Sequence, residues 1–445
     1  MKRYFSLTLL LLTSCSVFCQ DLSLRIDTLL NAYAKAMAFS GSVLVARHGE
    51  VLSNKGYGFK NISEKTMNDS NTVFQIGSIT KQFTAAIILQ LQEKHQLSVQ
   101  DKLAKYIPDY PKGDSITIEN LLTHTSGVYN YTNDRDFMKK GSIEPISRDS
   151  LIRLFKYKPL DFSPGTKYSY SNSGYILLGY IIEKVTGKPY FQVVHENIFG
   201  PLHMTHSGFD FKELTSTDKA TGYTNPSTGL KAEIVDSSVS LSAGAIYTTT
   251  GDLYKWDRAL YTDRIISQSS LQKAFTPHLE HYGYGWTMDS VYGKKVVEHG
   301  GGIFGFVSFI LRVPEEQICI IVLDNQPSAA GPGKIAADIN ALLHGQPYSL
   351  PHERVAITVD TNTLKQYVGA YQLNPNFIIT MTLDNGQLMT QATNQPKFPV
   401  FAEKENFFFL KVVDAQIEFV KGADGTVEKI ILYQNGRQQT ANKIK

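Results

Sequence analysis

The chain has 445 residues, of which 42% are hydrophobic and 19% are charged. This composition is that of a globular protein, long enough for one large domain and a smaller one, and it excludes a disordered chain. The formal net charge of +3 falls to +1 without Lys2 and Arg3, and no basic run follows them. Nothing in the composition therefore indicates nucleic-acid binding.

The N-terminal segment has the pattern of a secretory leader. Lys2 and Arg3 form a short positive region, the stretch 4–18 is apolar apart from small polar residues, and a polar Gln20 follows. The apolar stretch is too short for a comfortable membrane span, and no later stretch is long and apolar enough to cross a bilayer. We therefore interpret residues 1–19 as a signal peptide.

Two processing routes remain open for this leader. Val17 and Cys19 can occupy the small-residue cleavage positions, which predicts a mature start at Gln20. Alternatively, residues 12–15 resemble a lipoprotein box, in which case Cys15 would carry a lipid anchor. We favour simple export. Both routes predict an extracytoplasmic protein, either periplasmic or secreted.

The elements predicted for residues 20–345 place strands at both ends and helices between them. This order favours one antiparallel sheet that is built from both ends of the domain and flanked by helices. We therefore predict an α+β fold. In chain order, the elements are a helix over residues 22–37, strands over 42–47 and 51–57, helices over 78–95 and 174–185, strands over 282–288, 295–299, 305–313 and 317–324, and a helix over 335–343.

The pattern changes after this first domain. Residues 346–360 contain two prolines in a polar stretch, which predicts a linker. Residues 361–445 alternate short strand-like runs with turns, and the Asn-Gly pairs at 385–386 and 435–436 are good hairpin signals. We predict a small all-β domain over 361–445.

Candidate metal ligands are few. Cys319 is the only cysteine after the leader, and its apolar surroundings predict a buried small side chain. We therefore predict neither a metal site nor a disulfide. Two histidine pairs with a spacing of three residues lie outside the His-Glu-x-x-His pattern of zinc enzymes, namely His203 with His206 and His278 with His281.

Ser78 and Lys81 begin the apolar helix predicted over 78–95 and, being three residues apart, share one face of it. A serine hydroxyl is a poor nucleophile unless a neighbouring base takes its proton. Lys81 can be that base if desolvation and nearby positive charge lower its pKa. The same Ser-x-x-Lys spacing occurs at Ser216 and Ser270, but neither opens a long apolar helix, so we interpret both as capping or surface serines.

A second motif, Tyr170-Ser171-Asn172, follows a Pro-Gly turn and precedes the next apolar helix. The Tyr170 phenol can carry a proton to a leaving group, and the Asn172 amide can bind both a substrate amide and Lys81. The alternative is a buried tyrosine beside a helix-capping asparagine. Tyr168 competes for the role of Tyr170, but only Tyr170 has an asparagine two residues later.

A third motif, His299-Gly300-Gly301, ends a predicted strand at a glycine-rich corner. The three motifs in this order resemble the serine penicillin-recognising hydrolases, the superfamily of class C β-lactamases, D-Ala-D-Ala carboxypeptidases and related esterases. The resemblance covers roughly residues 25–345, and residues 367–371 are similar to the start of an accessory domain that often follows this hydrolase type. It implies a sheet flanked by helices and a mostly helical lobe, with the cleft at their junction.

The resemblance also implies a mechanism of acyl transfer. Ser78 would be the nucleophile, with Lys81 and Tyr170 moving protons. The backbone N–H of Gly302, together with that of Ser78, would form the oxyanion hole. Such a mechanism needs no metal or organic cofactor.

Substrate binding is implied for four residues: Asn172, His299, Gly300 and Gly301. Antibiotic-resistance enzymes of this type usually carry Lys-Thr-Gly in place of the histidine and two glycines, and that cation and hydroxyl hold the β-lactam carboxylate. Here His299 would be a weaker, pH-dependent cation, and Gly300 offers no hydroxyl. We therefore expect weak selection for a substrate carboxylate, and doubt efficient β-lactamase activity.

These observations predict an exported serine hydrolase that acts on esters, peptides or D-amino-acid amides of the cell envelope. Its partner would be a small-molecule or peptide substrate, with cell-wall fragments as one source. Two alternatives remain open: a non-catalytic relative that binds cell-wall peptides or a protein partner, and a true β-lactamase. The oligomeric state and the role of residues 361–445 also remain open.

Overall fold

The computed structural model describes residues 4–434 and 437–444. Lys2, Arg3 and the turn at 435–436 lie outside the described residues, as do the side chains of residues 4–20 on which the processing alternatives depend. Within the described range, no helix combines the length and the apolar character that a membrane crossing requires.

Two compact units make up the chain, and each has its own hydrophobic core. The larger unit comprises Met1–Asn31, Phe39–Pro327 and Gly331–Ser349. The smaller unit comprises Leu350–Lys445 together with the short segments Ala32–Ala38 and Ser328–Ala330.

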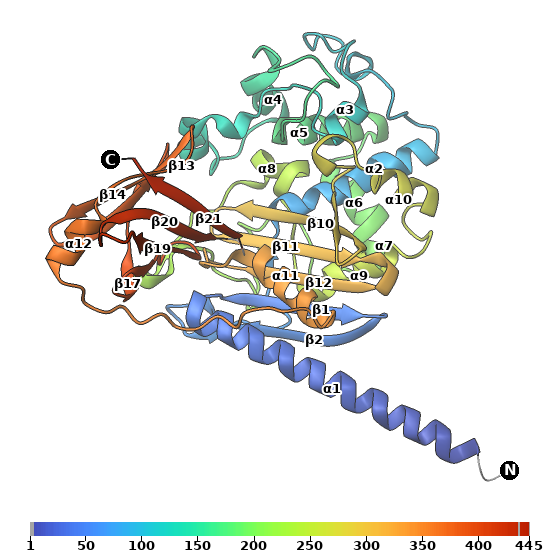
Figure 1. The fold of residues 1–445 in the computed structure, drawn as a ribbon. Helices are drawn as coiled ribbons and strands as arrows, with labels where there is room; N and C mark the ends of the chain where they lie inside the picture. The colour runs from blue at the N-terminus through green and yellow to red at the C-terminus, as the bar shows by residue number, and fades with distance from the viewer. Residues whose placement is uncertain (1–3, 435–436, 445) are drawn as a thin grey trace. The chain divides into compact units, whose positions relative to one another are not determined.

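The larger unit is built on a six-stranded antiparallel sheet with the order β2-β1-β12-β11-β10-β9 (Figure 1). The first two strands come from one end of the unit and the other four from the opposite end, and β1 pairs with β12. The predicted α+β fold, with a sheet built from both ends of the domain, is therefore confirmed. The strands are β1 (Gly41–Arg47), β2 (Glu50–Tyr57), β9 (Thr287–Val291), β10 (Lys294–Ile303), β11 (Phe306–Val313) and β12 (Ile318–Asp324).

Helices cover both faces of this sheet, so every residue of the central strand β12 is buried. Phe309 of β11 lies against Gly333 of α11 (Gly331–Leu343). Arg312, three residues along and therefore on the opposite face, bonds Asp257 of α9 (Thr250–Ala259). The remaining helices up to residue 343 are α1 (Tyr4–Met37), α2 (Thr80–Glu93), α3 (Ile118–Leu122), α4 (Arg148–Lys156), α5 (Asn172–Thr186), α6 (Tyr190–Val194), α7 (Gly200–Leu202), α8 (Ser237–Gly244) and α10 (Gln268–Ala274).

Short two-stranded sheets also belong to the larger unit: β3 with β4 and β6 with β7 are local hairpins, whereas the third joins segments that lie far apart in the sequence. This third sheet pairs β5, just before Ser78, with β8, just after helix α8. These strands are β3 (Phe59–Asn61), β4 (Thr66–Met67), β5 (Phe74–Gln75), β6 (Tyr223–Asn225), β7 (Leu230–Lys231) and β8 (Tyr247–Thr248).

Two features of this unit differ from the prediction. The predicted strand over 282–288 is wrong for most of its length, since β9 begins only at Thr287. Its aromatic residues alternate with glycines, and Gly285 has a φ of +76°, outside the region of strands. Helices α6, α7, α8, α9 and α10 are not predicted, because none exceeds ten residues and a periodicity that short is ambiguous.

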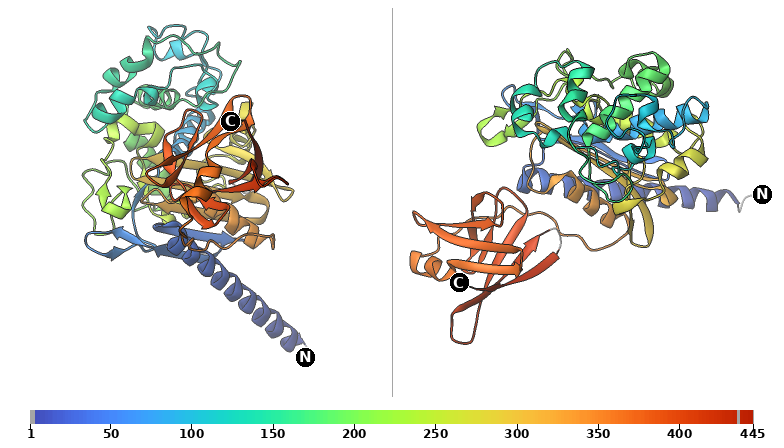
Figure 2. Two further views of the ribbon diagram at one scale, coloured as in Figure 1. Left: turned by 60° about the vertical axis from the view of Figure 1, so that its left-hand side comes forward. Right: turned by 90° about the horizontal axis from the view of Figure 1, so that it is seen from above.

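The smaller unit is a nine-stranded antiparallel sheet preceded by helix α12 (Thr361–Tyr367). The strands at its two ends, β16 and β17, are separated in the chain by Val400 alone, so the sheet curls into a near-barrel (Figure 2). Tyr371, Met381 and Ile430 are buried in its core. The predicted all-β domain is confirmed. Its strands are β13 (Gly369–Asn374), β14 (Phe377–Asp384), β15 (Gln387–Ala392), β16 (Lys397–Pro399), β17 (Phe401–Lys404), β18 (Phe407–Phe409), β19 (Ala415–Lys421), β20 (Val427–Gln434) and β21 (Arg437–Lys443).

Candidate active site

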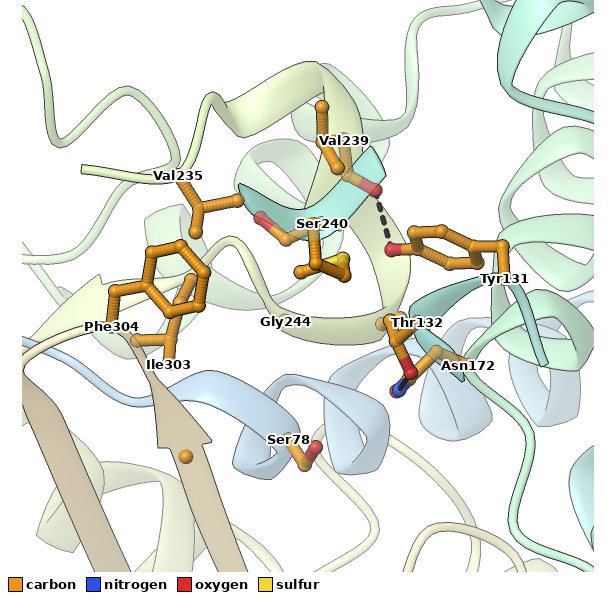
Figure 3. Close-up of a pocket in the computed structure, with 13 residues that line it drawn as sticks. Ser78, Tyr131, Thr132, Asn172, Val235, Val239, Ser240, Gly244, Ile303 and Phe304 are labelled. Atoms are coloured by element: carbon orange, nitrogen blue, oxygen red, sulfur yellow. Dashed lines mark hydrogen bonds between the residues drawn. The ribbon is translucent and has the colours of Figure 1, made fainter. Parts of the chain in front are cut away.

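Ser78 lies in a single 3-10 turn, Gly77–Ile79, that leads directly into α2. Gly77 has a φ of +49°, and a Cβ on it would lie 2.7 Å from the Gly302 nitrogen. Only glycine permits so close an approach in this conformation, and the turn therefore brings Ser78 beside strand β10. The Ser78 side chain is partly exposed and borders a cavity (Figure 3).

Lys81 is completely buried on α2, one turn after Ser78. Its Nζ lies 3.0 Å from Ser78 Oγ, 2.8 Å from Asn172 Oδ1 and 2.7 Å from the Ala243 carbonyl oxygen. Burial lowers the pKa of Lys81 well below its usual value, because the charged amine loses its water. A neutral amine has two N–H groups, which match the Asn172 and Ala243 oxygens, and one lone pair, which is left for the Ser78 hydroxyl proton.

The Ala243 carbonyl reaches Lys81 because helix α8 is kinked. Leu241 inside this helix has φ 24° and ψ −116°, a conformation that L residues rarely adopt. Just after the kink, the Ser242 carbonyl accepts a hydrogen bond from Thr84 Oγ1 at 2.6 Å, and the Ala243 carbonyl accepts one from Lys81. Backbone strain in α8 is thus coupled to two polar contacts with α2.

Tyr170 lies beside Lys81, whose Nζ is 4.9 Å from the centre of the Tyr170 ring. The ring is partly exposed, whereas its hydroxyl is buried and makes no hydrogen bond of ordinary geometry within the described structure. Burial raises the pKa of Tyr170 above its usual value, and the nearby Ser78 hydroxyl offsets part of that rise. The phenol therefore keeps its proton at neutral pH and is suited to proton donation.

Asn172 is the first residue of α5 and follows the N-cap residue Ser171. Its side chain makes no capping bond: Oδ1 accepts from Lys81, and Nδ2 donates to Thr132 Oγ1 at 3.2 Å. Its backbone N–H donates to Asn130 Oδ1 at 3.1 Å. The Asn172 side-chain amide therefore binds Lys81 and does not cap helix α5.

His299 is buried on β10, with 6% of its surface exposed, and both ring nitrogens have partners. Nδ1 donates to the Gly300 carbonyl at 2.5 Å, and Nε2 accepts from the Tyr282 hydroxyl at 2.8 Å. Burial, together with the nearby Lys81 amine, lowers the pKa of His299 to about 3. The expectation of a pH-dependent cation at this position is therefore wrong. Burial removes most of the solvent that would stabilise a charged ring, and with this pKa His299 is neutral at physiological pH.

The glycines that follow this histidine differ in the space around them. A Cβ on Gly301 would lie 2.0 Å from the Ile76 carbonyl oxygen, whereas a Cβ on Gly302 would have no atom within 4 Å. Gly300 has neighbours only at ordinary contact distance. Gly301 is therefore required for the close packing of β10 on the segment before Ser78, and Gly302 borders the same cavity as Ser78.

The cavity beside Ser78 has a volume of about 340 Å³ (Figure 3). Figure 3 shows Ile303 and Phe304 on one side and Tyr131 on the other, with the Tyr131 hydroxyl donating to the Val239 carbonyl at 2.7 Å. None of the described residues that line it carries a formal charge at neutral pH, and Tyr170 does not border it. The cavity therefore extends away from the phenol. Its apolar walls come from Met138, Val235, Val239, Ala243, Ile303 and Phe304.

The other two Ser-x-x-Lys sequences lack this pairing. Ser216 lies in a loop and accepts a hydrogen bond from the Asp218 backbone, while Lys219 donates to two backbone carbonyls. Ser270 lies within α10. Across residues 21–434, only Ser78 of these three serines has its side chain hydrogen-bonded to the side chain of its lysine. In the same described part of the chain, no group of three or more His, Cys, Asp or Glu residues could hold a metal ion.

His124 and Tyr282 belong to the same cluster of side chains but are not predicted from the sequence. The centre of the His124 ring lies 4.1 Å from that of Tyr170 and 4.7 Å from that of Tyr282, which also bonds His299. The only sequence signal for His124 is its place in the polar run Thr-His-Thr-Ser-Gly after two leucines. Tyr282 begins the segment that was expected to be a strand.

Comparisons with known proteins extend these observations. A profile described as beta-lactamase matches residues 28–344, and a profile of a domain of unknown function, DUF3471, matches residues 353–443. The chain is 28% identical to penicillin-binding protein 4* of Bacillus subtilis, over 95% of this chain and 98% of that protein. It is also 28% identical to the teichoic acid D-alanine hydrolase of Staphylococcus aureus, over 66% of this chain and 72% of that protein. The solved octameric penicillin-binding protein homologue from Pyrococcus abyssi has a TM-score of 0.67 and 25% identity, covering 94% of this chain and 99% of that one.

Gly301→Ala and Gly302→Ala form a matched pair of variants. The new methyl group would overlap the Ile76 carbonyl at position 301, but at position 302 it meets no atom and leaves the backbone N–H in place. We expect Gly301→Ala to slow the reaction of Ser78 with a fluorophosphonate at least about 100-fold, and Gly302→Ala to slow it less than about 5-fold. Intact-mass spectrometry over time measures both rates. Equal rates would contradict the packing described for β10.

The pH dependence of the same labelling reaction reports on the Lys81 amine. For a mechanism in which the neutral amine accepts the Ser78 proton, the rate should rise with pH through the lowered pKa of Lys81 and level off well below the usual pKa of lysine. His299 has a pKa of about 3 and is already neutral in this range. His299→Gln should therefore move the midpoint of the rise by less than about 0.5 pH units. A larger shift would mean that the histidine carries charge near neutral pH.

Proposed function

This chain belongs to the beta-lactamase family, and we propose that it is a serine hydrolase that works through an acyl ester on Ser78. The observation that carries the proposal is the buried Lys81 amine, which lies 3.0 Å from the Ser78 hydroxyl. Burying a lysine amine costs free energy that an apolar side chain would not cost. A lysine at this position is therefore best explained by chemistry at Ser78.

Acylation uses the groups gathered around Ser78. The Ser78 hydroxyl gives its proton to the Lys81 amine while Oγ attacks the carbonyl carbon of the substrate. The backbone N–H groups of Ser78 and Gly302 stabilise the negative charge that develops on the carbonyl oxygen. The bond to the leaving group then breaks, and the Tyr170 phenol supplies the proton that the leaving group takes. Tyr170 recovers a proton from the Lys81 ammonium.

Deacylation reverses these roles with water as the nucleophile. A water molecule gives a proton to the Lys81–Tyr170 pair and attacks the acyl carbon, which releases the acid and restores the Ser78 hydroxyl. Apart from this water, the groups that carry out both steps are side chains and backbone N–H groups of this chain.

The acyl part of the substrate occupies the apolar cavity beside Ser78. Because Tyr170 protonates the leaving group, the cavity that extends away from Tyr170 is left for the acyl group. Its lining is apolar and without formal charge, His299 is neutral, and Gly300 offers no hydroxyl. We therefore propose esters, peptides or D-amino-acid amides with an apolar acyl side chain. The relative named teichoic acid D-alanine hydrolase supports a D-amino-acyl substrate.

Two alternative functions are less well supported. A non-catalytic binding protein gives no reason for the contact between Lys81 and Ser78. A true β-lactamase binds a substrate carboxylate, and a neutral His299 offers that carboxylate no cation.

Export is a separate part of the proposal, and it is supported by the leader pattern of residues 1–19. The protein then acts outside the cytoplasm on a small molecule or peptide derived from the cell wall. Cleavage before Gln20 and lipidation of Cys15 are the two alternatives for its mature N-terminus.

Ser78→Ala should lower the turnover of p-nitrophenyl butyrate at least about a thousandfold and abolish labelling by a fluorophosphonate. Ser216→Ala is the matched control, since it also begins a Ser-x-x-Lys sequence, and it should behave as the unchanged protein. Absorbance measures turnover, and intact-mass spectrometry measures the adduct. Turnover by Ser78→Ala would refute the mechanism. An unchanged protein that reacts with neither phosphonate, penicillin nor ester would favour the non-catalytic alternative.

The p-nitrophenyl esters of hexanoic acid and of adipic acid share one leaving group and one chain length, but only the second has a free carboxylate. We expect kcat/KM to favour the hexanoate by at least about tenfold, because the charged end would lose its water in an apolar cavity. Val239→Lys, which adds a cation to the cavity wall, should narrow this preference. Equal use of both esters by the unchanged protein would contradict the proposed substrate class.

A further inference from the structure

We propose that His124 is a positioning residue that holds Tyr170 against Lys81 and Ser78 by bonding the backbone on both sides of it. The Ser169 N–H donates to the His124 carbonyl at 2.9 Å, and the Ser171 N–H donates to His124 Nδ1 at 3.1 Å. One residue thus provides both acceptors that flank Tyr170.

The backbone of His124 has the unusual conformation that this arrangement needs. Its φ is +57°, a left-handed value that few non-glycine residues adopt, and its carbonyl and its ring both reach the 169–171 segment. Residues close to His124 bond the chain before and after the 169–171 segment. The Thr125 carbonyl accepts from the Gly165 N–H at 2.8 Å, and the Leu122 carbonyl accepts from the Tyr175 hydroxyl at 2.9 Å.

The protonation of the ring favours a role as hydrogen-bond acceptor. Nδ1 accepts a hydrogen bond and so carries no proton, which leaves the proton on Nε2. Nε2 is buried and has no hydrogen-bond partner within the described structure, and such a group destabilises a fold. Burial, helped by the nearby Lys81 and His299, lowers the pKa of His124 well below its usual value.

Packing alone does not explain this histidine. The His124 ring lies 4.1 Å from that of Tyr170 and is completely buried, so a phenylalanine would fill the same space without an unpaired N–H. What histidine adds is the acceptor at Nδ1 for the Ser171 N–H. The position of Tyr170 is thus tied to a hydrogen bond that an apolar ring cannot make.

The inference rests on the proposed role of Tyr170 as the proton donor to the leaving group. A misplaced phenol should slow substrates whose leaving group needs a proton, such as alkyl esters and amides. It should hardly affect p-nitrophenyl esters, whose leaving group departs as a stable anion. A general loss of folding would slow both kinds of substrate alike.

Two variants of His124 separate the hydrogen bond from the ring. His124→Phe keeps an aromatic ring and removes the acceptor. His124→Asn keeps an acceptor at the same number of bonds from the backbone and tolerates a positive φ. We read kcat/KM, which reports acylation, because deacylation of the common acyl-enzyme is the same for both esters. We expect His124→Phe to lower kcat/KM for an ethyl ester at least about tenfold, and for the matching p-nitrophenyl ester less than about threefold. His124→Asn should stay within about threefold of the unchanged protein on both esters.

A double-mutant cycle with Tyr170→Phe tests whether His124 acts through Tyr170. Tyr170→Phe should show the same dependence of kcat/KM on the leaving group, and adding His124→Phe should lower kcat/KM for the ethyl ester by less than about a further twofold. His278→Phe is the control, because the His278 ring also stacks on a tyrosine, Tyr284, at 5.8 Å. It should leave both rates unchanged.

The positioning role would be overturned by equal losses on both esters in His124→Phe, by additive losses in the cycle, or by no rescue in His124→Asn. Thermal unfolding of each variant shows whether a loss reflects the fold. The proposed function fails separately, through retained turnover in Ser78→Ala. A loss in Tyr170→Phe without a loss in His124→Phe overturns the positioning role alone.

Discussion

A lysine amine keeps its charge in water, and burying it without a counter-charge favours its neutral form. In this protein the whole site is arranged around that burial. Helix α2 carries Lys81, α5 presents the Asn172 amide oxygen, and a kink at Leu241 in α8 presents the Ala243 carbonyl. Two fixed acceptors leave the amine a single free direction, and Ser78 lies in that direction. Three helices far apart in the sequence must therefore meet before the Lys81 amine is held against Ser78.

The sheet side of the site contributes shape and carries no charge. Gly77 and Gly301 allow β10 to approach the turn that holds Ser78. His299 lies on the same strand, and both of its ring nitrogens are hydrogen-bonded to neighbouring groups. At the site, β10 therefore contributes only uncharged groups, and it borders the apolar cavity beside Ser78. Polar chemistry is concentrated at Ser78, Lys81 and their immediate partners.

The parts of this arrangement that depend on local pattern can be predicted from the sequence. The sheet follows from strands at both ends of the domain, and the proximity of Ser78 and Lys81 follows from helix geometry. The neutral state of His299 cannot be predicted, because it depends on burial against a tyrosine from another segment. The contribution of Ala243 depends on a backbone kink, and that of His124 on a loop conformation. The alternation of aromatic residues and glycine over 282–286 matches the two-residue period of a strand, although the chain bends there.

The pairing of β1 with β12 bears on how the larger unit folds as well as on its final structure. The register aligns Gly41, near the start of the larger unit, with Asp324, near its end. To form contacts so distant in sequence, the chain must close a long loop. The loss of chain entropy comes before the contacts stabilise the fold, so folding of this unit is intrinsically slow. The turn at Ser78 also needs Gly302 packed beside it. A growing chain therefore cannot bring Ser78 beside Gly302 until the strands near the end of the unit have been made, and the candidate site is assembled only when the unit is nearly complete.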